Sequence, residues 1–219
     1  MRVQWANMNK SILLKTWLPI LGFIAGTVLI IVLLISPESQ SGASVLLALD
    51  DQISGNPEAK TVLIEYSDFQ CPACRIFEPT LKTLREENTD KLQFAYRHFP
   101  LKTIHSRAEL AARASEAAGK QDAFWKMHDL IFDRQSEWAR AGNEETFINY
   151  ARELGLNAEQ FGDDLKSSAV QAEVDQDYQS GRDAGVDSTP TFFLNGKKMQ
   201  FRTIDEFVAI VNQAIGDGF

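Results

Sequence analysis

Residues 65–74 read Glu-Tyr-Ser-Asp-Phe-Gln-Cys-Pro-Ala-Cys and contain both cysteines of the 219-residue chain. A strand-like run, 61–66, leads into this stretch, and the apolar residues after it recur at the spacing of one helical face. The cysteines are therefore predicted at a strand-to-helix turn, with Cys71 at the helix N-terminus. Unpaired backbone N–H groups and the helix dipole favour a thiolate there. Cys71 is expected to be the exposed, attacking sulfur, and Cys74 its shielded disulfide partner.

The spacing of the two cysteines distinguishes between three uses of such a pair. A structural disulfide stabilises a protein most when it closes a long loop, and two intervening residues constrain the unfolded chain little. A zinc site needs four ligands, and the remaining candidates, His98, His105 and His128, do not lie at zinc-finger spacing. The spacing therefore favours redox chemistry, for which we expect neither a metal nor an organic cofactor.

The N-terminal part of the chain predicts a single-pass membrane anchor. Residues 17–35 carry no charged side chain, and a helix of that length approaches the thickness of a hydrocarbon core. Three basic residues and no acid precede this run, so the N-terminus is expected in the cytoplasm and the rest in the periplasmic or extracellular space. A cleaved signal peptide is the alternative, because Ser41 and Ala43 are small residues at a suitable distance.

Acidic residues outnumber basic ones, 30 to 22, which gives the chain a net charge of −8. With no basic patch after the N-terminal segment, nucleic acid is not expected as a partner.

The remaining pattern predicts an α/β fold with an all-helical insertion. Strands are expected at 61–66 and 92–99, on either side of the helix that opens at the cysteines. Asn-Gly at 195–196 is a strong hairpin signal between two further strands, and an amphipathic helix closes the chain. The predicted divisions are a cytoplasmic segment 1–16, a transmembrane signal anchor 17–36, a linker 37–55, a first sheet part 56–104, a helical insertion 105–184 and a second sheet part 185–219.

This arrangement resembles the thioredoxin fold, and specifically the DsbA-like thiol:disulfide oxidoreductases, over about residues 56–215. The resemblance is carried by a Cys-x-x-Cys motif after a strand, a helix containing Pro79, and a Thr-Pro pair before a later strand. It implies that Cys71 is the nucleophile and Cys74 the buried cysteine. It also implies that Glu65 is the buried acid of the site and that Pro190 is a cis-proline lying against it.

Three further residues are expected to contact the substrate. They are Pro72 and Ala73, which lie between the cysteines, and Thr189, which precedes the proline that the resemblance places against the site. The most strongly oxidising members of the family that this chain resembles carry a histidine between the cysteines, whereas this chain has Pro72 and Ala73 there.

Two of these assignments have structural alternatives. Glu65 interrupts an apolar strand, where it could be a buried acid paired with a lysine; as a carboxyl of raised pKa it could instead exchange a proton with Cys74. Pro190 could be a trans-proline that opens a strand. Because the chain also carries the Cys-x-x-Cys motif, we favour a proton-exchanging role for Glu65 and a cis peptide bond before Pro190.

The sequence therefore predicts thiol–disulfide exchange by a redox-active Cys71–Cys74 pair, in a monomeric oxidase that forms disulfides in exported polypeptides. The resemblance implies reoxidation by a quinone-linked membrane protein of the DsbB or vitamin K epoxide reductase type. Two alternatives stay open: a reductase or isomerase of exported disulfides, and a non-catalytic peptide-binding or chaperone module.

Overall fold

The computed structural model describes residues 44–217. The predicted cytoplasmic segment and transmembrane anchor, 1–36, lie outside the described residues. Within residues 44–217, no helix combines the length and the apolar character that a membrane crossing requires.

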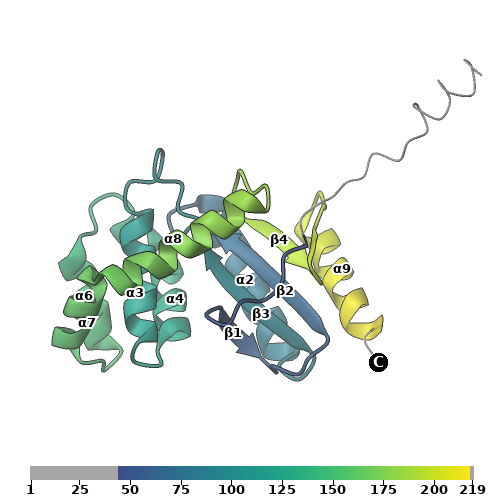
Figure 1. Ribbon diagram of the computed structural model, residues 1–219, viewed down its shortest axis with the longest axis horizontal. Coiled ribbons are helices and arrows are strands. Elements are labelled where there is room, and N and C mark those ends of the chain that lie inside the picture. The colour runs from purple at the N-terminus through teal and green to yellow at the C-terminus, as the bar shows by residue number, and fades with distance from the viewer. Residues whose placement is uncertain (1–43, 218–219) are drawn as a thin grey trace, which may run out of the picture. The chain divides into compact units, whose positions relative to one another are not determined.

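A mixed sheet forms the centre of the described part of the chain (Figure 1). Its strand order is β1-β3-β2-β4-β5, and only β2 and β3 run parallel to each other. Helix α2, Pro72–Glu87, connects these two strands, which confirms the predicted βαβ unit. The strands are β1 Gln52–Gly55, β2 Thr61–Ser67, β3 Leu92–His98, β4 Thr191–Leu194 and β5 Lys197–Lys198.

Helices cover both faces of the sheet, so β2 and β3 are almost entirely buried. Alternate residues of a strand point to opposite faces. Leu63 packs in a core with α2 and the closing helix α9, Ile204–Asp217, whereas Ile64 packs in a second core with Phe193 on the other face. Glu65 lies two residues after Leu63 on the same strand, so its side chain points to the same face of the sheet, the one that α2 covers.

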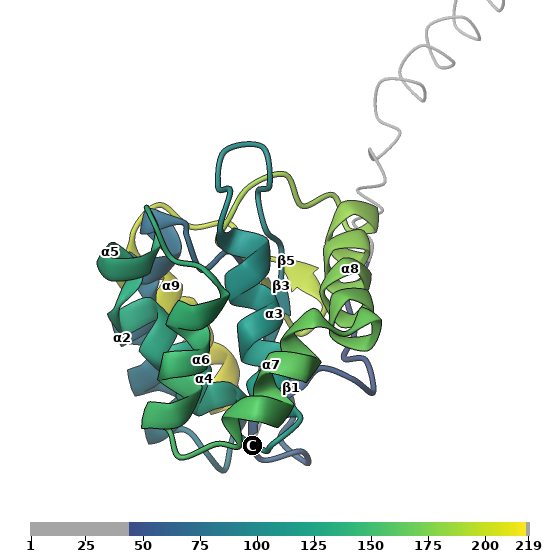
Figure 2. The same cartoon turned by 90° about the vertical axis from the view of Figure 1, so that its left-hand side faces the viewer.

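The predicted insertion, 105–184, consists of helices and loops. Figure 1 shows α3, α4, α6 and α7 gathered at the left-hand end of the described part of the chain, and Figure 2 shows this end facing the viewer. Helix α8 lies against β3, and the short helix α5 is an element that the sequence pattern does not predict. The helices are α3 Ala108–Gly119, α4 Phe124–Asp133, α5 Gln135–Trp138, α6 Glu144–Glu153, α7 Ala158–Lys166 and α8 Ser168–Asp183.

The prediction of a linker over 37–55 is wrong for the end of that range, because residues 52–55 form the edge strand β1. The residues before β1 are held by a buried cation. Arg97 of β3 donates to both carboxylate oxygens of Asp51, at 2.6 and 2.8 Å, and to the carbonyl oxygen of Leu46 at 2.7 Å. A buried guanidinium needs such partners, and this segment supplies them.

Three backbone positions require particular residues. Asn195 and Gly196 adopt φ angles of 48° and 81°, as the tight turn between β4 and β5 demands, which confirms the predicted hairpin. Gly181 lets α8 approach the sheet closely, because a Cβ atom at this position would lie 2.6 Å from the ring of Phe99.

Candidate active site

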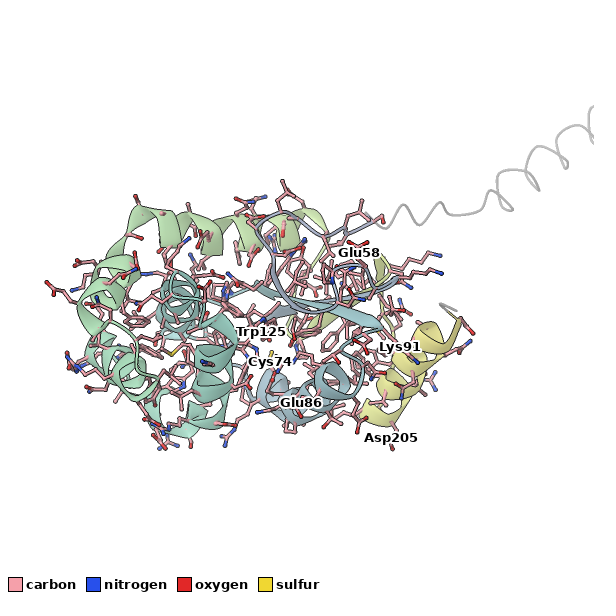
Figure 3. The ribbon with its side chains drawn as sticks, turned by 90° about the horizontal axis from the view of Figure 1, so that it is seen from below. Glu58, Cys74, Glu86, Lys91, Trp125 and Asp205 are labelled. Atoms are coloured by element: carbon pink, nitrogen blue, oxygen red, sulfur yellow. The ribbon has the colours of Figure 1, made fainter. Side chains whose placement is uncertain are left out.

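The two cysteines lie where β2 gives way to α2, as predicted. Cys71 is the residue that precedes the helix, with extended backbone angles, and Pro72 occupies the first turn, where a missing N–H group does not weaken the helix. Cys74 lies one turn further on and faces the core. Figure 3 shows Cys74 within the body of the molecule, and Glu86 on the same helix.

The prediction of an exposed Cys71 needs correction. Cys71 keeps 7% of its surface accessible and Cys74 keeps 1%, so the order of exposure is as predicted but both side chains are largely buried. The segment around Thr189 causes this, because the Thr189 carbonyl oxygen lies 3.4 Å from the Cys71 sulfur. Only a small part of the Cys71 side chain is therefore accessible to an attacking group.

The surroundings of the two thiols separate their acidities. A hydrogen bond from the Cys74 thiol is the main factor that lowers the pKa of Cys71, and it outweighs the opposing effect of burial. The Thr189 side chain and the backbone N–H groups of Cys74 and Ala73 lower this pKa further. Burial raises the pKa of Cys74 well above its ordinary value. The site therefore favours a thiolate on Cys71 and a neutral thiol on Cys74.

Glu65 is 1% exposed on β2, six residues before Cys71. Neither of its carboxylate oxygens has a hydrogen-bond partner within the described part of the chain. Burial raises the pKa of Glu65 to about 7, although the nearby Ser67 side chain and, to a smaller extent, the positive charge of Arg85 act in the opposite direction. Glu65 can consequently hold or release a proton near neutral pH.

This shift predicts how the Glu65→Gln variant responds to pH. The folded protein holds the Glu65 proton more tightly than the unfolded chain, so wild-type stability falls as pH rises from about 4.5 to about 7. The variant lacks this loss. It should be more stable than wild type at pH 8, by an amount on the order of 2–3 kcal/mol, and nearly equal to it at pH 4.5.

Urea titrations at the two pH values measure this difference. Glu86→Gln, an exposed substitution on α2, is the control for the effect of replacing a carboxyl group by an amide without a change in burial. A stability difference between Glu65→Gln and wild type that does not vary with pH would contradict the assigned pKa.

A buried cluster of charges lies on the inner face of α2, and the sequence reasoning missed it. The Arg85 guanidinium is 4.5 Å from the Trp125 ring and donates to Glu78 at 2.7 Å and to Asp129 at 3.3 Å. Burial raises the pKa of Glu78 to about 8. Glu78 and Arg85 are seven residues apart on the face that carries Cys74, and this helical spacing was the available signal. The cation near Glu65 is thus an arginine of α2.

The loop before β4 completes the site. The Thr189–Pro190 peptide bond is cis, which confirms that expectation. Pro72 and Ala73 are exposed at the start of α2. The structure thus brings Thr189 into contact with Cys71 and leaves the two residues between the cysteines open to solvent.

The histidines considered as zinc ligands have other partners. His98 pairs with Glu116 at 2.9 Å, and His105 pairs with Asp68 at 2.8 Å. His128 contacts Asp129 at 3.0 Å. Two groups of potential ligands do come together among residues 44–217, and neither includes a cysteine; they are Glu78 with His128 and Asp129, and His98 with Glu116 and Asp177.

The family profile described as "Thioredoxin" matches residues 48–213. Among solved structures, α-DsbA1 of Wolbachia pipientis is 21% identical with a TM-score of 0.68, over 80% of this chain and 95% of that one. BdbD of Bacillus subtilis is 20% identical with a TM-score of 0.66, over 76% and 93%. A thioredoxin-like oxidoreductase of Silicibacter pomeroyi is 25% identical with a TM-score of 0.64, over 76% and 93%. These likenesses establish a thioredoxin-like α/β fold.

Curated relatives include much longer proteins. The Na(+)/H(+) antiporter NhaA of Herminiimonas arsenicoxydans is 40% identical over 150 residues, which cover 68% of this chain and 23% of the antiporter. The Na(+)/H(+) antiporter NhaA 3 of Salinispora tropica is 36% identical over 148 residues, or 68% and 22%. The chain thus spans about a quarter of the length of these relatives.

Proposed function

The chain belongs to the thioredoxin family, and from that premise we propose that it catalyses thiol–disulfide exchange through Cys71 and Cys74. The observation that carries this proposal is the unequal environment of the two sulfurs. Cys71 precedes a helix and has a lowered pKa, whereas Cys74 is shielded and has a raised one. A pair with one good leaving group and one protected thiol suits this reaction.

The reaction begins with an oxidised Cys71–Cys74 pair. A substrate thiolate attacks the Cys71 sulfur, the bond between the two cysteines breaks, and Cys74 leaves with the electron pair. Glu65, with its pKa near 7, supplies the proton that makes Cys74 a neutral thiol. A second substrate thiolate then attacks the substrate sulfur of the mixed disulfide, and Cys71 leaves as a thiolate. The substrate has lost two electrons and the cysteine pair has gained them.

The preferred direction is oxidation of the substrate. The stabilised thiolate of Cys71 exists only in the reduced protein, so the environment of the sulfur favours the reduced state. Reduction or isomerisation of disulfides is the second candidate, because the same two sulfurs serve the reverse reaction. A non-catalytic peptide-binding or chaperone role is the third.

Pro190, Thr189, Pro72 and Ala73 are proposed to border the substrate. Thr189 already contacts Cys71, and the residues between the cysteines are exposed. No basic patch is expected to recruit the substrate, so we propose reduced exported polypeptides, bound chiefly through backbone and apolar contacts beside Cys71.

We further propose that the protein is a single-pass membrane protein with its thioredoxin-like part outside the cytoplasm. The uncharged residues 17–35 and the basic residues before them support this topology. Recovery of the chain as a soluble species beginning near Ser44 would contradict it, and retention in alkali-washed membranes would support it.

We propose that a quinone-linked membrane reoxidase of the DsbB or vitamin K epoxide reductase type accepts the electrons from the reduced cysteine pair. We also propose that the protein is a monomer.

A dithiol peptide tests the proposed reaction. The oxidised full-length protein in detergent is mixed with the reduced peptide at pH 7, and thiols on both are quantified by alkylation and mass spectrometry. Each peptide disulfide formed should be matched by one reduced Cys71–Cys74 pair, with repeated turnover when oxidised glutathione is added.

The double Cys71→Ser, Cys74→Ser variant is the control and should show only the background rate. An oxidised protein that leaves the peptide reduced would exclude the oxidase. If the reduced protein instead reduces a disulfide form of the peptide, the result would support a reductase.

A further inference from the structure

The active-site turn, residues 68–71, is fastened to the helical part of the molecule by three side chains. The one that bonds the nucleophile's own peptide group is Gln135, the first residue of α5, which is 6% exposed. Its side-chain nitrogen donates to the carbonyl oxygen of Phe69 at 2.7 Å and to that of Cys71 at 3.0 Å. The amide of glutamine has two N–H donors, one for each carbonyl.

The other two side chains fasten the neighbouring residues. Asp68 accepts hydrogen bonds from the backbone N–H of Leu101 and from the His105 ring, both at 2.8 Å. The Gln70 side chain donates to the carbonyl of Ala139 at 2.8 Å and accepts from the N–H of Arg107 at 2.7 Å. These contacts hold Asp68 and Gln70 in place, but they do not reach the peptide group of Cys71.

The carbonyl group that Gln135 contacts is part of the helix start. The Cys71 carbonyl oxygen also accepts the first helical hydrogen bond, from the N–H of Arg75 at 3.2 Å. Two donors on one carbonyl fix the plane of the Cys71–Pro72 peptide group. The orientation of that plane determines whether the Cys71 sulfur faces the free N–H groups of Ala73 and Cys74.

We propose that Gln135 is a positioning residue that holds the Cys71 sulfur against the N-terminus of α2, and so sets the stability of its thiolate. The inference rests on the proposed function for its consequence in exchange, but its first effect is on the sulfur itself. Gln135 does not touch the reacting atoms. It acts through the backbone of Cys71, from an element that lies 64 residues away in the sequence.

The Gln135→Met variant tests the proposal, because methionine keeps the length of the side chain and removes both donors. The pKa of Cys71, measured from the pH dependence of its alkylation rate in the reduced protein, should rise by about one unit. A thiolate that is less stable by this amount shifts the equilibrium with glutathione about tenfold toward the Cys71–Cys74 disulfide.

Gln93→Met is the matched control. Gln93 is also buried and donates at 2.7 Å to a carbonyl, that of Ala59, but it lies at the start of β3, whereas the cysteines follow the end of the parallel strand β2. Its replacement should cost similar stability, since a buried carbonyl loses its donor in both variants. The pKa of Cys71 and the glutathione equilibrium should stay at wild-type values.

Two outcomes would overturn the proposal. The first is a folded Gln135→Met protein whose Cys71 has the wild-type pKa, and the second is an equal shift in Gln93→Met. If Gln135→Met does not fold, Gln135→Asn retains the amide on a shorter stem, and a wild-type pKa in that variant would also contradict the proposal. A wild-type protein that exchanges no disulfides would refute the proposed function instead, because the alkylation measurement does not depend on exchange.

Discussion

The Cys74→Ser variant is expected to accumulate a mixed disulfide with a disulfide-bonded peptide, and the Cys71→Ser variant is expected to form none. In Cys74→Ser, the Cys71 thiolate attacks the peptide, and the thiol that would release it within the protein is gone. In Cys71→Ser, the sulfur that remains is 1% exposed and burial raises its pKa, so it is neither accessible nor ionised. Turnover should fall to background in both variants.

Mass spectrometry of the intact protein after quenching with acid measures the adduct. The double Cys71→Ser, Cys74→Ser variant should show no adduct and controls for other sites of attachment. Equal trapping by the two single variants would contradict the division of labour between the cysteines. An adduct formed only by the Cys71→Ser variant would mean that Cys74 is the attacking sulfur.

Much of the fold follows from local patterns in the sequence. The apolar run before Cys71 and the helical spacing after it predict β2 and α2, and the Asn-Gly pair predicts the hairpin at 195–196. These signals are reliable because each depends on neighbouring residues: a buried face repeats with the period of its element, and a tight turn needs residues that tolerate positive φ.

The features that the sequence did not reveal depend on partners far along the chain. β1 is four residues long and belongs to the sheet because β3 pairs with it. The burial of Arg85 is compensated by Trp125 and by acids from two helices, and a pattern of apolar residues cannot show such a compensated charge. Gln135 is one polar residue in a short helix, and its role follows only from the two carbonyls that it meets.

The site residues divide in the same way. Cys71 and Cys74 are found from their spacing, and Glu65 from being the one acid in an apolar strand. The near-burial of Cys71 depends on the segment around Thr189, which lies more than a hundred residues away. For this reason the sequence predicts the order of exposure of the two sulfurs correctly but overstates how open the first of them is.

The reduced state of the Cys71–Cys74 pair is expected to be more stable than the disulfide, which is the second prediction with a large effect. In the reduced protein the Cys71 thiolate is stabilised by the Cys74 thiol, the Thr189 side chain and the helix N-terminus, whereas a disulfide carries no charge and gains nothing from them. We expect this to favour the reduced state by about 1–3 kcal/mol, where ~30 mV of potential corresponds to roughly 1.4 kcal/mol. The preference should shrink as pH falls through the pKa of Cys71, because a protonated thiol loses the same contacts.

The equilibrium of the Cys71–Cys74 pair with reduced and oxidised glutathione at pH 7 measures this preference most directly. Mixtures of fixed total glutathione are brought to equilibrium with the full-length protein, and the fraction of reduced protein is read after acid quenching and alkylation. An oxidase predicts that the pair becomes reduced by small amounts of reduced glutathione, and that the required amount rises at lower pH. A pair that stays oxidised in a large excess of reduced glutathione would contradict the account and would indicate a reductase or a structural disulfide.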